Sequence, residues 1–121
     1  MGTPTEEFFA DLSRRRRDER LAGTTGTVRV DLSNGRKTEH WYLTIADGEV
    51  EVGRANDPAD SVVYIDREFF DELVTGRANA MAAVLRGALT IEGRPDLPIQ
   101  LQRIFPGPPD AVGPRQMAVS A

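Results

Sequence analysis

The chain has 121 residues, the length of one globular domain. It contains 15 basic and 19 acidic residues, and its net charge of -4 argues against a nucleic-acid binder. Cysteine is absent, and His40 and Lys37 are the only histidine and lysine, so thiol chemistry, disulfides and a multi-histidine metal site are excluded within one chain. A Ser-His-Asp arrangement would have to use His40. We therefore expect binding rather than catalysis, with no catalytic residue, no metal and no cofactor.

Two further properties concern the location and origin of the protein. No stretch approaches the ~18 apolar residues that span a bilayer, and the first residues lack the basic and apolar regions of a secretory signal. We therefore expect a cytoplasmic protein. The excess of Arg over Lys is typical of a GC-rich genome and favours a bacterial source.

The first expected element is a helix. Thr3, Pro4 and Glu6 stand where a helix takes its cap, its first-turn proline and its capping-box acid. Apolar residues between positions 8 and 12 share one helical stripe and should dock on the domain, with membrane contact as the alternative. The charged run at residues 14–20 should be a solvated helix end, the alternative being contact with anionic lipid head groups.

Three segments between residues 28 and 52 alternate apolar and polar residues, as half-buried antiparallel strands do. Asn34-Gly35 and Asp47-Gly48 are favoured turn pairs, so we expect a meander. His40 should point to the polar face, either as a surface histidine or as a general base beside Glu49 or Glu51. The alternating apolar positions are Val28, Val30, Leu32, Trp41, Leu43, Ile45, Val50 and Val52.

Two helices are expected after a fourth strand. Residues 61–65 are rich in β-branched side chains and predict the strand. Asp66 should cap the first helix, which ends at Gly76. Asn79 should cap the second helix, which is stopped by Gly87.

The last elements are a short strand and a helix. Residues 88–93 predict the strand, and apolar residues at helical spacing over 97–105 predict the helix, which Pro106 ends. Residues 107–121 are rich in proline and glycine and should form a mobile tail. One apolar sheet face with helices available to cover it predicts an α+β layered domain.

Four segments in this order carry a family resemblance. Asp60–Ile65 resembles a strand that enters an acid-rich helix, and Asp66–Gly76 resembles that helix. Asn79–Ala83 resembles an "Asn-Pro-Met-x-Ala" helix start, with alanine in place of the commoner proline. Arg86–Gly93 resembles a "Gly-x-Leu-x-Ile-x-Gly" strand. Together they resemble the sterol carrier protein 2 family, with coverage of about residues 4–106.

The resemblance implies a fold and a function. Residues 1–106 should form a lipid-binding domain with a five-stranded mixed, mainly antiparallel sheet, helices packed on one face and an apolar cavity between them. The implied function is non-enzymatic binding or transfer of a fatty acid, acyl-CoA or sterol-like lipid, with transient membrane contact, an unknown partner protein and no nucleic acid. The alternatives are a protein-interaction module with a closed core and a small enzyme acting on an apolar substrate.

The candidate ligand-binding residues are apolar side chains that would line the cavity while also packing in the core. Such a stripe is by itself more often plain core, and the resemblance raises the ligand-binding interpretation. Met81 is favoured for ligand contact because an unbranched thioether adapts to varied apolar shapes. The last helix could move as a lid over the cavity. The candidates are Trp41, Leu43, Phe69, Phe70, Leu73, Met81, Leu85, Ile91, Leu101, Ile104 and Phe105.

Overall fold

A computed structural model describes residues 2–105, and the expected C-terminal tail, residues 107–121, lies outside them. The strands are β1 (Thr25–Asn34), β2 (Lys37–Ala46), β3 (Glu49–Gly53), β4 (Ser61–Asp66) and β5 (Leu89–Gly93). The helices are α1 (Pro4–Arg15), α2 (Arg67–Val74), α3 (Ala80–Leu85) and α4 (Asp96–Leu101), with the 3₁₀ turns η1 (Glu19–Leu21) and η2 (Gln102–Ile104).

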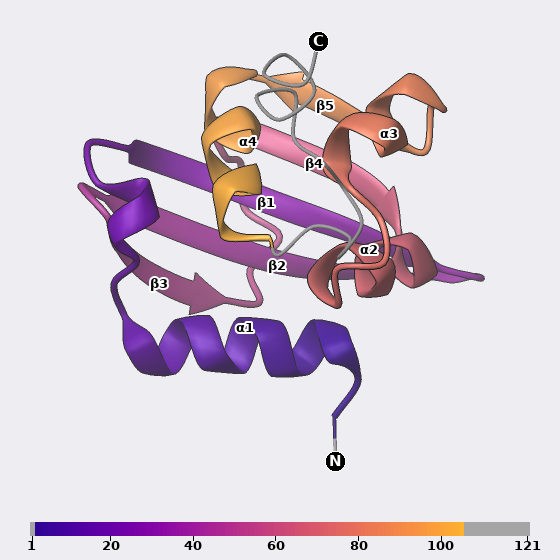
Figure 1. Cartoon of the computed structure of the whole chain (residues 1–121), viewed down its shortest axis with the longest axis horizontal. Helices are drawn as coiled ribbons and strands as arrows, with labels where there is room; N and C mark the ends of the chain where they lie inside the picture. Colours follow the sequence, from indigo (N-terminus) through magenta and orange to yellow (C-terminus); the bar gives the residue numbers. More distant parts are fainter. Residues whose placement is uncertain (1, 106–121) are drawn as a thin grey trace, which may run out of the picture.

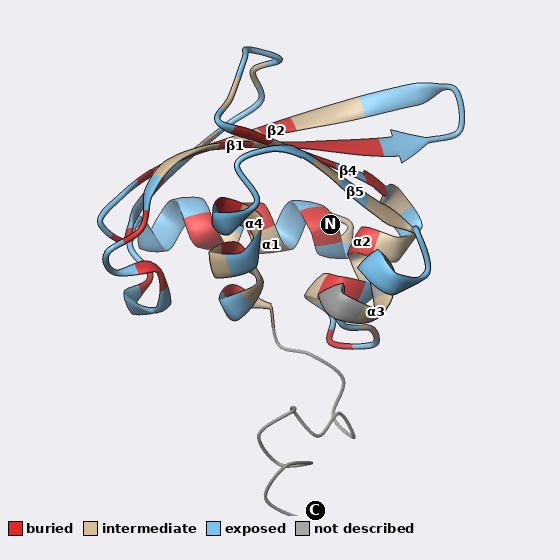
Figure 2. Cartoon of the chain, turned by 90° about the horizontal axis from the view of Figure 1, so that it is seen from above, coloured by how far each residue is buried: buried red, intermediate tan, exposed pale blue. Residues whose placement is uncertain are grey.

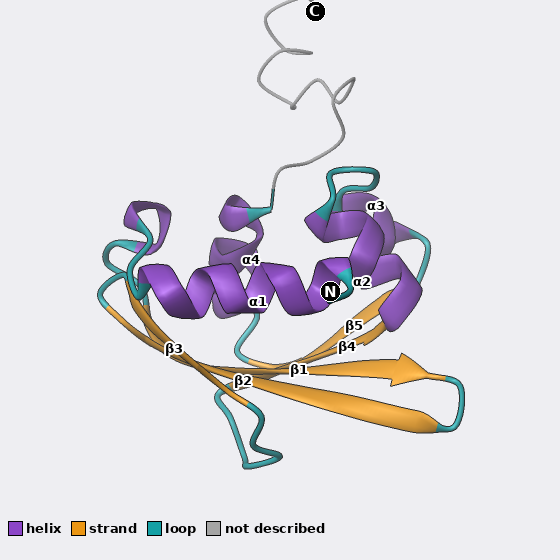
Figure 3. Ribbon diagram, turned by 90° about the horizontal axis from the view of Figure 1, so that it is seen from below, coloured by secondary structure: helices purple, strands orange, loops and turns teal. Residues whose placement is uncertain are grey.

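The described strands form one sheet in the order β3-β2-β1-β4-β5. The pair β1–β4 is parallel and the other three pairs are antiparallel. All four α-helices lie on the same side of this sheet, and its other face is left open (Figures 1 and 3). The predicted five-stranded mixed sheet with helices on one face is therefore confirmed.

Helix α1 begins as the sequence predicts. The Thr3 hydroxyl accepts a hydrogen bond from the Glu6 amide at 3.2 Å, and the Glu6 carboxylate accepts one from the Thr3 amide at 3.1 Å. The capping box is thus complete, with Pro4 at the first helical position. The helix ends at Arg15, and the C-cap residue Arg16 adopts a left-handed conformation with φ 63°. Its docked face buries Phe9 and Leu12.

The meander follows the predicted pattern with one shifted turn. Asp47 and Gly48 both have positive φ, 51° and 90°, as a two-residue type I′ turn requires. In the first hairpin, Asn34 pairs with Lys37, so the turn residues are Gly35 and Arg36 rather than Asn34 and Gly35. Gly35 takes the first turn position with φ 66°, which costs a glycine nothing.

The connection from β3 to β4 crosses the open face and is fastened there by hydrogen bonds. The Asp60 carboxylate accepts from the Thr27 amide at 3.0 Å, and the Tyr42 hydroxyl donates to the Pro58 carbonyl at 2.8 Å. On the far side of β4, the Arg94 amide donates to the Asp60 carbonyl at 2.9 Å. These bonds fix where β4 enters the sheet beside β1.

Helix boundaries after β4 agree with the sequence, with two differences in detail. Asp66 is the N-cap residue of α2, as predicted, but its side chain makes no cap bond and instead accepts from the Ser33 hydroxyl at 3.2 Å. Asn79 does cap α3, since its side-chain oxygen accepts from the Ala82 amide at 2.7 Å. The helix predicted over 97–105 is divided into α4 and the tighter turn η2, a common way to end a helix.

The core lies between the sheet and the helix layer. Figure 2 shows buried residues on the inward side of both layers and exposed residues on the open face and the hairpin tips. The buried apolar side chains are Phe9, Leu12, Leu21, Val28, Val30, Leu32, Trp41, Leu43, Ile45, Val50, Val63, Ile65, Phe70, Leu73, Leu97, Leu101 and Ile104.

Candidate functional site

A pocket of ≈ 220 Å³ lies between the β1, β4 and β5 side of the sheet and the helices α2, α3 and α4. The sheet supplies its floor, because alternate residues of each strand point toward the helices. The helices supply its walls. The lining residues are Val30, Val63, Phe70, Leu73, Val84, Leu89, Ile91, Pro98, Ile99, Leu101, Gln102 and Phe105.

The chemistry of this lining is apolar. Among the described residues that form it, Gln102 alone has a polar side chain, and none carries a charge. Val30 and Val63 on the floor are 2% and 6% exposed, whereas Val84 and Ile99 are 44% and 54% exposed. The pocket therefore has a buried floor and a mouth formed by α3 and α4. Such a site can remove an apolar chain from water, which is favourable by roughly 0.8 kcal/mol per methylene.

Five of the eleven candidate residues from the sequence line this pocket. They come from three elements and from the residue after η2, so the tertiary structure brings together positions up to 35 residues apart. Phe70 and Leu73 lie one helical turn apart on α2 and form one wall. The five are Phe70, Leu73, Ile91, Leu101 and Phe105.

Three more candidates are buried elsewhere in the core. Trp41 and Leu43 are 8% and 0% exposed and lie on β2, which contributes no side chain to the pocket. Ile104 is 4% exposed and packs in the core without lining the pocket. The β2 side chains are separated from the pocket because β1 stands between β2 and β4 in the sheet.

The remaining candidates lie around α3. Phe69 is partly buried on α2, and the Arg86 guanidinium lies 5.0 Å from the centre of its ring. Leu85 is 79% exposed and lies outside the lining. The side chain of Met81 lies outside the described part of the structure.

The pocket also contains residues that the sequence analysis did not select as site residues. Val30 and Val63 are paired across β1 and β4 and form the floor. The strand alternation places both on the apolar face, and this signal could have found them. Pro98, Ile99 and Gln102 had no such signal, because a six-residue helix shows too few turns to reveal which side faces the sheet.

His40 lies on the open face of the sheet, as its alternation with Trp41 predicts. Its Nδ1 atom is 2.7 Å from the Asp31 carboxylate, which also accepts from Arg29 Nε at 2.9 Å. The alternative of a general base beside Glu49 or Glu51 is wrong, because β1 lies beside this part of β2 and places Asp31 opposite His40. The histidine and the pocket therefore lie on opposite faces.

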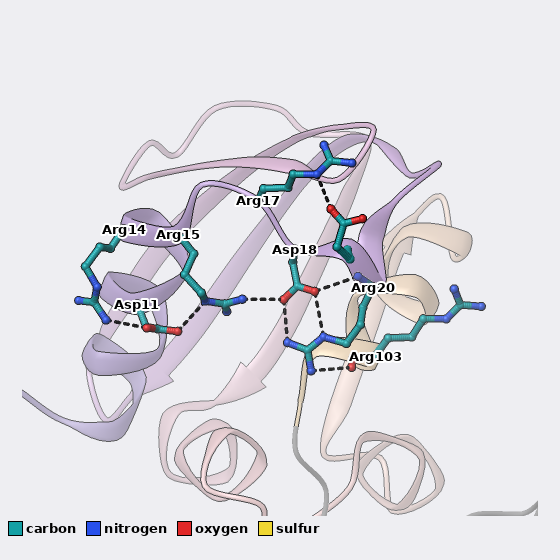
Figure 4. Close-up of polar contacts among 8 residues, drawn as sticks. Asp11, Arg14, Arg15, Arg17, Asp18, Arg20 and Arg103 are labelled. Atoms are coloured by element: carbon teal, nitrogen blue, oxygen red, sulfur yellow. Dashed lines mark hydrogen bonds and ion pairs between the residues drawn. The ribbon is translucent and has the colours of Figure 1, made fainter.

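The charged run after α1 is an ordered ion-pair cluster rather than a solvated helix end (Figure 4). The Asp18 side chain is only 3% exposed and accepts from Arg20 Nη2 at 2.7 Å and from Arg15 Nη1 at 3.0 Å. The hydrogen bonds from Arg20 hold the pKa of the Asp18 carboxyl well below its ordinary value, against the opposing effect of burial. Asp11 in turn pairs with Arg14 and Arg15. Four of the five arginines of this run, Arg14, Arg15, Arg17 and Arg20, are therefore ion-paired with Asp11, Asp18 or Glu19.

Fold and pocket together define a small α+β domain built around an apolar pocket. The chain belongs to the SCP-2 sterol transfer family, whose pattern it matches over residues 7–106, so the family resemblance is confirmed. Sterol carrier protein 2 of Yarrowia lipolytica, in its apo form, has the same fold: the TM-score is 0.62 at 24% identity, over 80% of this chain and 83% of that one.

Two curated relatives share shorter regions. A fatty acid-binding protein of Yarrowia lipolytica is 35% identical over 60 residues, which are 47% of this chain and 46% of that protein. Peroxisomal multifunctional enzyme A of Dictyostelium discoideum is 26% identical over 84 residues, which are 68% of this chain and 19% of that protein. The matches thus span about half and about a fifth of the lengths of these relatives.

Among the described residues, no helix has the length and apolar character needed to cross a membrane.

Proposed function

We propose that this chain binds a lipid in the apolar pocket and transfers it without chemical change, with residues 1–106 as the lipid-binding unit. The observation that carries the proposal is the pocket itself, whose described lining is uncharged and, apart from Gln102, apolar. Family membership supports it, and so does the name of the fatty acid-binding relative from Yarrowia lipolytica.

The size of the pocket bears on the ligand. An apolar cavity of about 150 Å³ holds one benzene ring, and pockets for complete small-molecule ligands span about 300–1,000 Å³. At ≈ 220 Å³ the pocket takes part of an acyl chain as it stands. A longer chain must extend through the mouth between Val84 and Ile99 or push these half-exposed side chains apart. We therefore favour a fatty acyl chain over a rigid sterol ring system as the ligand.

The proposed ligand contacts are the five predicted residues that line the pocket, Phe70, Leu73, Ile91, Leu101 and Phe105, together with Val30 and Val63 of its floor. Met81 remains a prediction for the same role. Affinity would come from methylene burial, which is worth about fourfold per group before the cost of association is subtracted.

The test fills the pocket from its floor. Ile91→Trp places an indole in the space that an acyl chain would occupy, whereas Thr90→Trp places the same indole on the open face, because neighbouring strand residues point to opposite sides. We expect the wild type and Thr90→Trp to bind a fluorescent fatty acid alike, and Ile91→Trp to bind it at least tenfold more weakly. Absence of fatty-acid binding by the wild type, or equal binding by Ile91→Trp, would reject the proposal.

A further inference from the structure

Exposed apolar side chains gather at the mouth of the pocket. Among the described residues, four large apolar side chains are exposed, and three of them are Val84, Leu85 and Ile99 at 44%, 79% and 54%. Val84 on α3 and Ile99 on α4 line the mouth of the pocket. Both helices belong to the layer that covers one side of the sheet (Figure 3). The apolar surface is thus concentrated where a ligand would enter.

The charge of these segments differs from that of the rest of the chain. Residues 73–91 and 97–105, here called the mouth segments, contain Arg77, Arg86 and Arg103 and none of the 19 acidic residues. They carry a charge of +3, which leaves 12 basic and 19 acidic residues, a charge of -7, elsewhere. Neither Arg77 nor Arg86 forms an ion pair with a described residue. Arg86 follows Val84 and Leu85 directly in the chain, so it adds positive charge beside the exposed apolar side chains, where an anionic surface attracts it.

Helix α1 does not offer a comparable surface, although its sequence pairs an apolar stripe with a basic run. Phe9 and Leu12 are buried at 1% and 0% exposure. Arg14 and Arg15 are paired with Asp11, and Arg20 is paired with Asp18. Phe9 and Leu12 are therefore held in the core, and three arginines of the run already pair with carboxylates, so α1 presents no exposed apolar stripe to a membrane.

We propose that the mouth segments dock on a bilayer that contains anionic lipids. Val84, Leu85 and Ile99 enter the interfacial region, while Arg77 and Arg86 face the lipid phosphates. The pocket mouth then opens into the membrane, so an acyl chain passes between bilayer and pocket without crossing water. This last step rests on the proposed lipid transfer, whereas the docking itself rests on the exposed side chains and the charge.

The test is co-sedimentation of the full chain with vesicles of phosphatidylcholine, with and without phosphatidylglycerol. We expect binding to the anionic vesicles that weakens with added salt. Arg86→Gln should weaken it about fivefold, and Leu85→Ser combined with Arg86→Gln should weaken it further. The controls are matched in chemistry: Arg14→Gln removes an exposed arginine from α1, and Tyr64→Ser removes the exposed apolar residue of the open face. Both should bind like the wild type.

The outcomes separate docking from ligand binding. The double variant should still bind a fluorescent fatty acid when vesicles are absent, because neither residue lines the pocket. Equal binding to neutral and anionic vesicles, or unchanged vesicle binding by the double variant, would overturn the docking proposal and leave the pocket assay untouched. A monomer–dimer equilibrium in sedimentation that Leu85→Ser abolishes would assign this surface to a second copy and overturn it as well.

Discussion

The ring of Phe9 stacks on the indole of Trp41, with centroids 4.3 Å apart and 15° between the planes. This contact joins α1 to β2, and Phe9 also stacks on Phe70 of the pocket wall at 5.5 Å. Phe8 extends the same cluster to Phe105, at 5.4 Å. Helix α1 therefore packs against the pocket residues Phe70 and Phe105 without lining the pocket itself. Trp41 is connected to the pocket wall through Phe9.

Truncation of Phe9 should be costly, because its ring is 1% exposed and contacts two other aromatic rings. We expect Phe9→Ala to lower the free energy of unfolding by about 3–5 kcal/mol, the usual cost of a phenylalanine-sized cavity. Urea unfolding followed by Trp41 fluorescence measures it. As the control, Tyr64→Ala on the open face should cost about 1 kcal/mol or less. A similar small loss for Phe9→Ala would contradict the proposed supporting role.

The Asp18 cluster should make stability depend on pH in acid. Its carboxyl has a lowered pKa in the folded chain, chiefly because Arg20 donates hydrogen bonds to it, and an ordinary value of 3.8 when unfolded. The unfolded chain therefore takes up the proton first as the pH falls. The stabilisation is present above about pH 4 and is lost below it.

Asp18→Asn keeps the shape of the side chain and removes the charge. We expect it to lower the free energy of unfolding by about 2 kcal/mol at pH 7, since it leaves a buried site without its ion pair. The difference from the wild type should shrink as the pH falls below 4, which urea unfolding at several pH values measures. Asp11→Asn, whose carboxylate is 46% exposed, is the matched control with an expected loss within about 0.5 kcal/mol. A pH-independent difference for Asp18→Asn would contradict the ion-pair explanation.

Gly93 should not tolerate a side chain. It has φ 85°, and a Cβ atom there would collide with the Asp60 carbonyl oxygen at the start of β4. Gly35 has a similar φ of 66° with no atom near its Cβ position, so it isolates the cost of the backbone conformation. We expect Gly35→Ala to cost about 1 kcal/mol and Gly93→Ala clearly more, in thermal or urea unfolding. Equal losses of stability in the two variants would show that the backbone at Asp60 moves aside for a Cβ atom at little cost.

Ligand affinity should depend on chain length in a defined way. Each methylene that enters the pocket is worth about 0.8 kcal/mol, so the Kd of saturated fatty acids should fall about fourfold per added methylene. The fall should level off once the pocket is filled. Competition against a fluorescent fatty acid measures the series. An affinity that does not change with chain length would mean that the acyl chain stays outside the pocket.

Local patterns account for most of the element order. The capping box at Thr3, the Asp47-Gly48 turn and the Asn79 cap act within a few residues, so they are readable in sequence. Strand alternation likewise assigns His40 and Trp41 to opposite faces of β2. These features depend only on residues close in sequence, so the folded chain shows them as predicted.

What only the tertiary structure decided is which apolar residues surround free space. Trp41 and Ile91 both stand on the apolar face of a strand, yet one packs under α1 and the other lines the pocket. The parallel pairing of β4 with β1 produces this difference, because it moves β4 and β5 to the far side of β1, where α2, α3 and α4 leave a gap. The charged run at residues 14–20 is a second example. Its charges are visible in the sequence, but the burial of Asp18 between Arg15 and Arg20 is a property of the folded chain. Composition and alternation determined the α+β fold class. Long-range packing decided where the pocket lies, because a pocket forms where side chains from distant parts of the chain leave space between them.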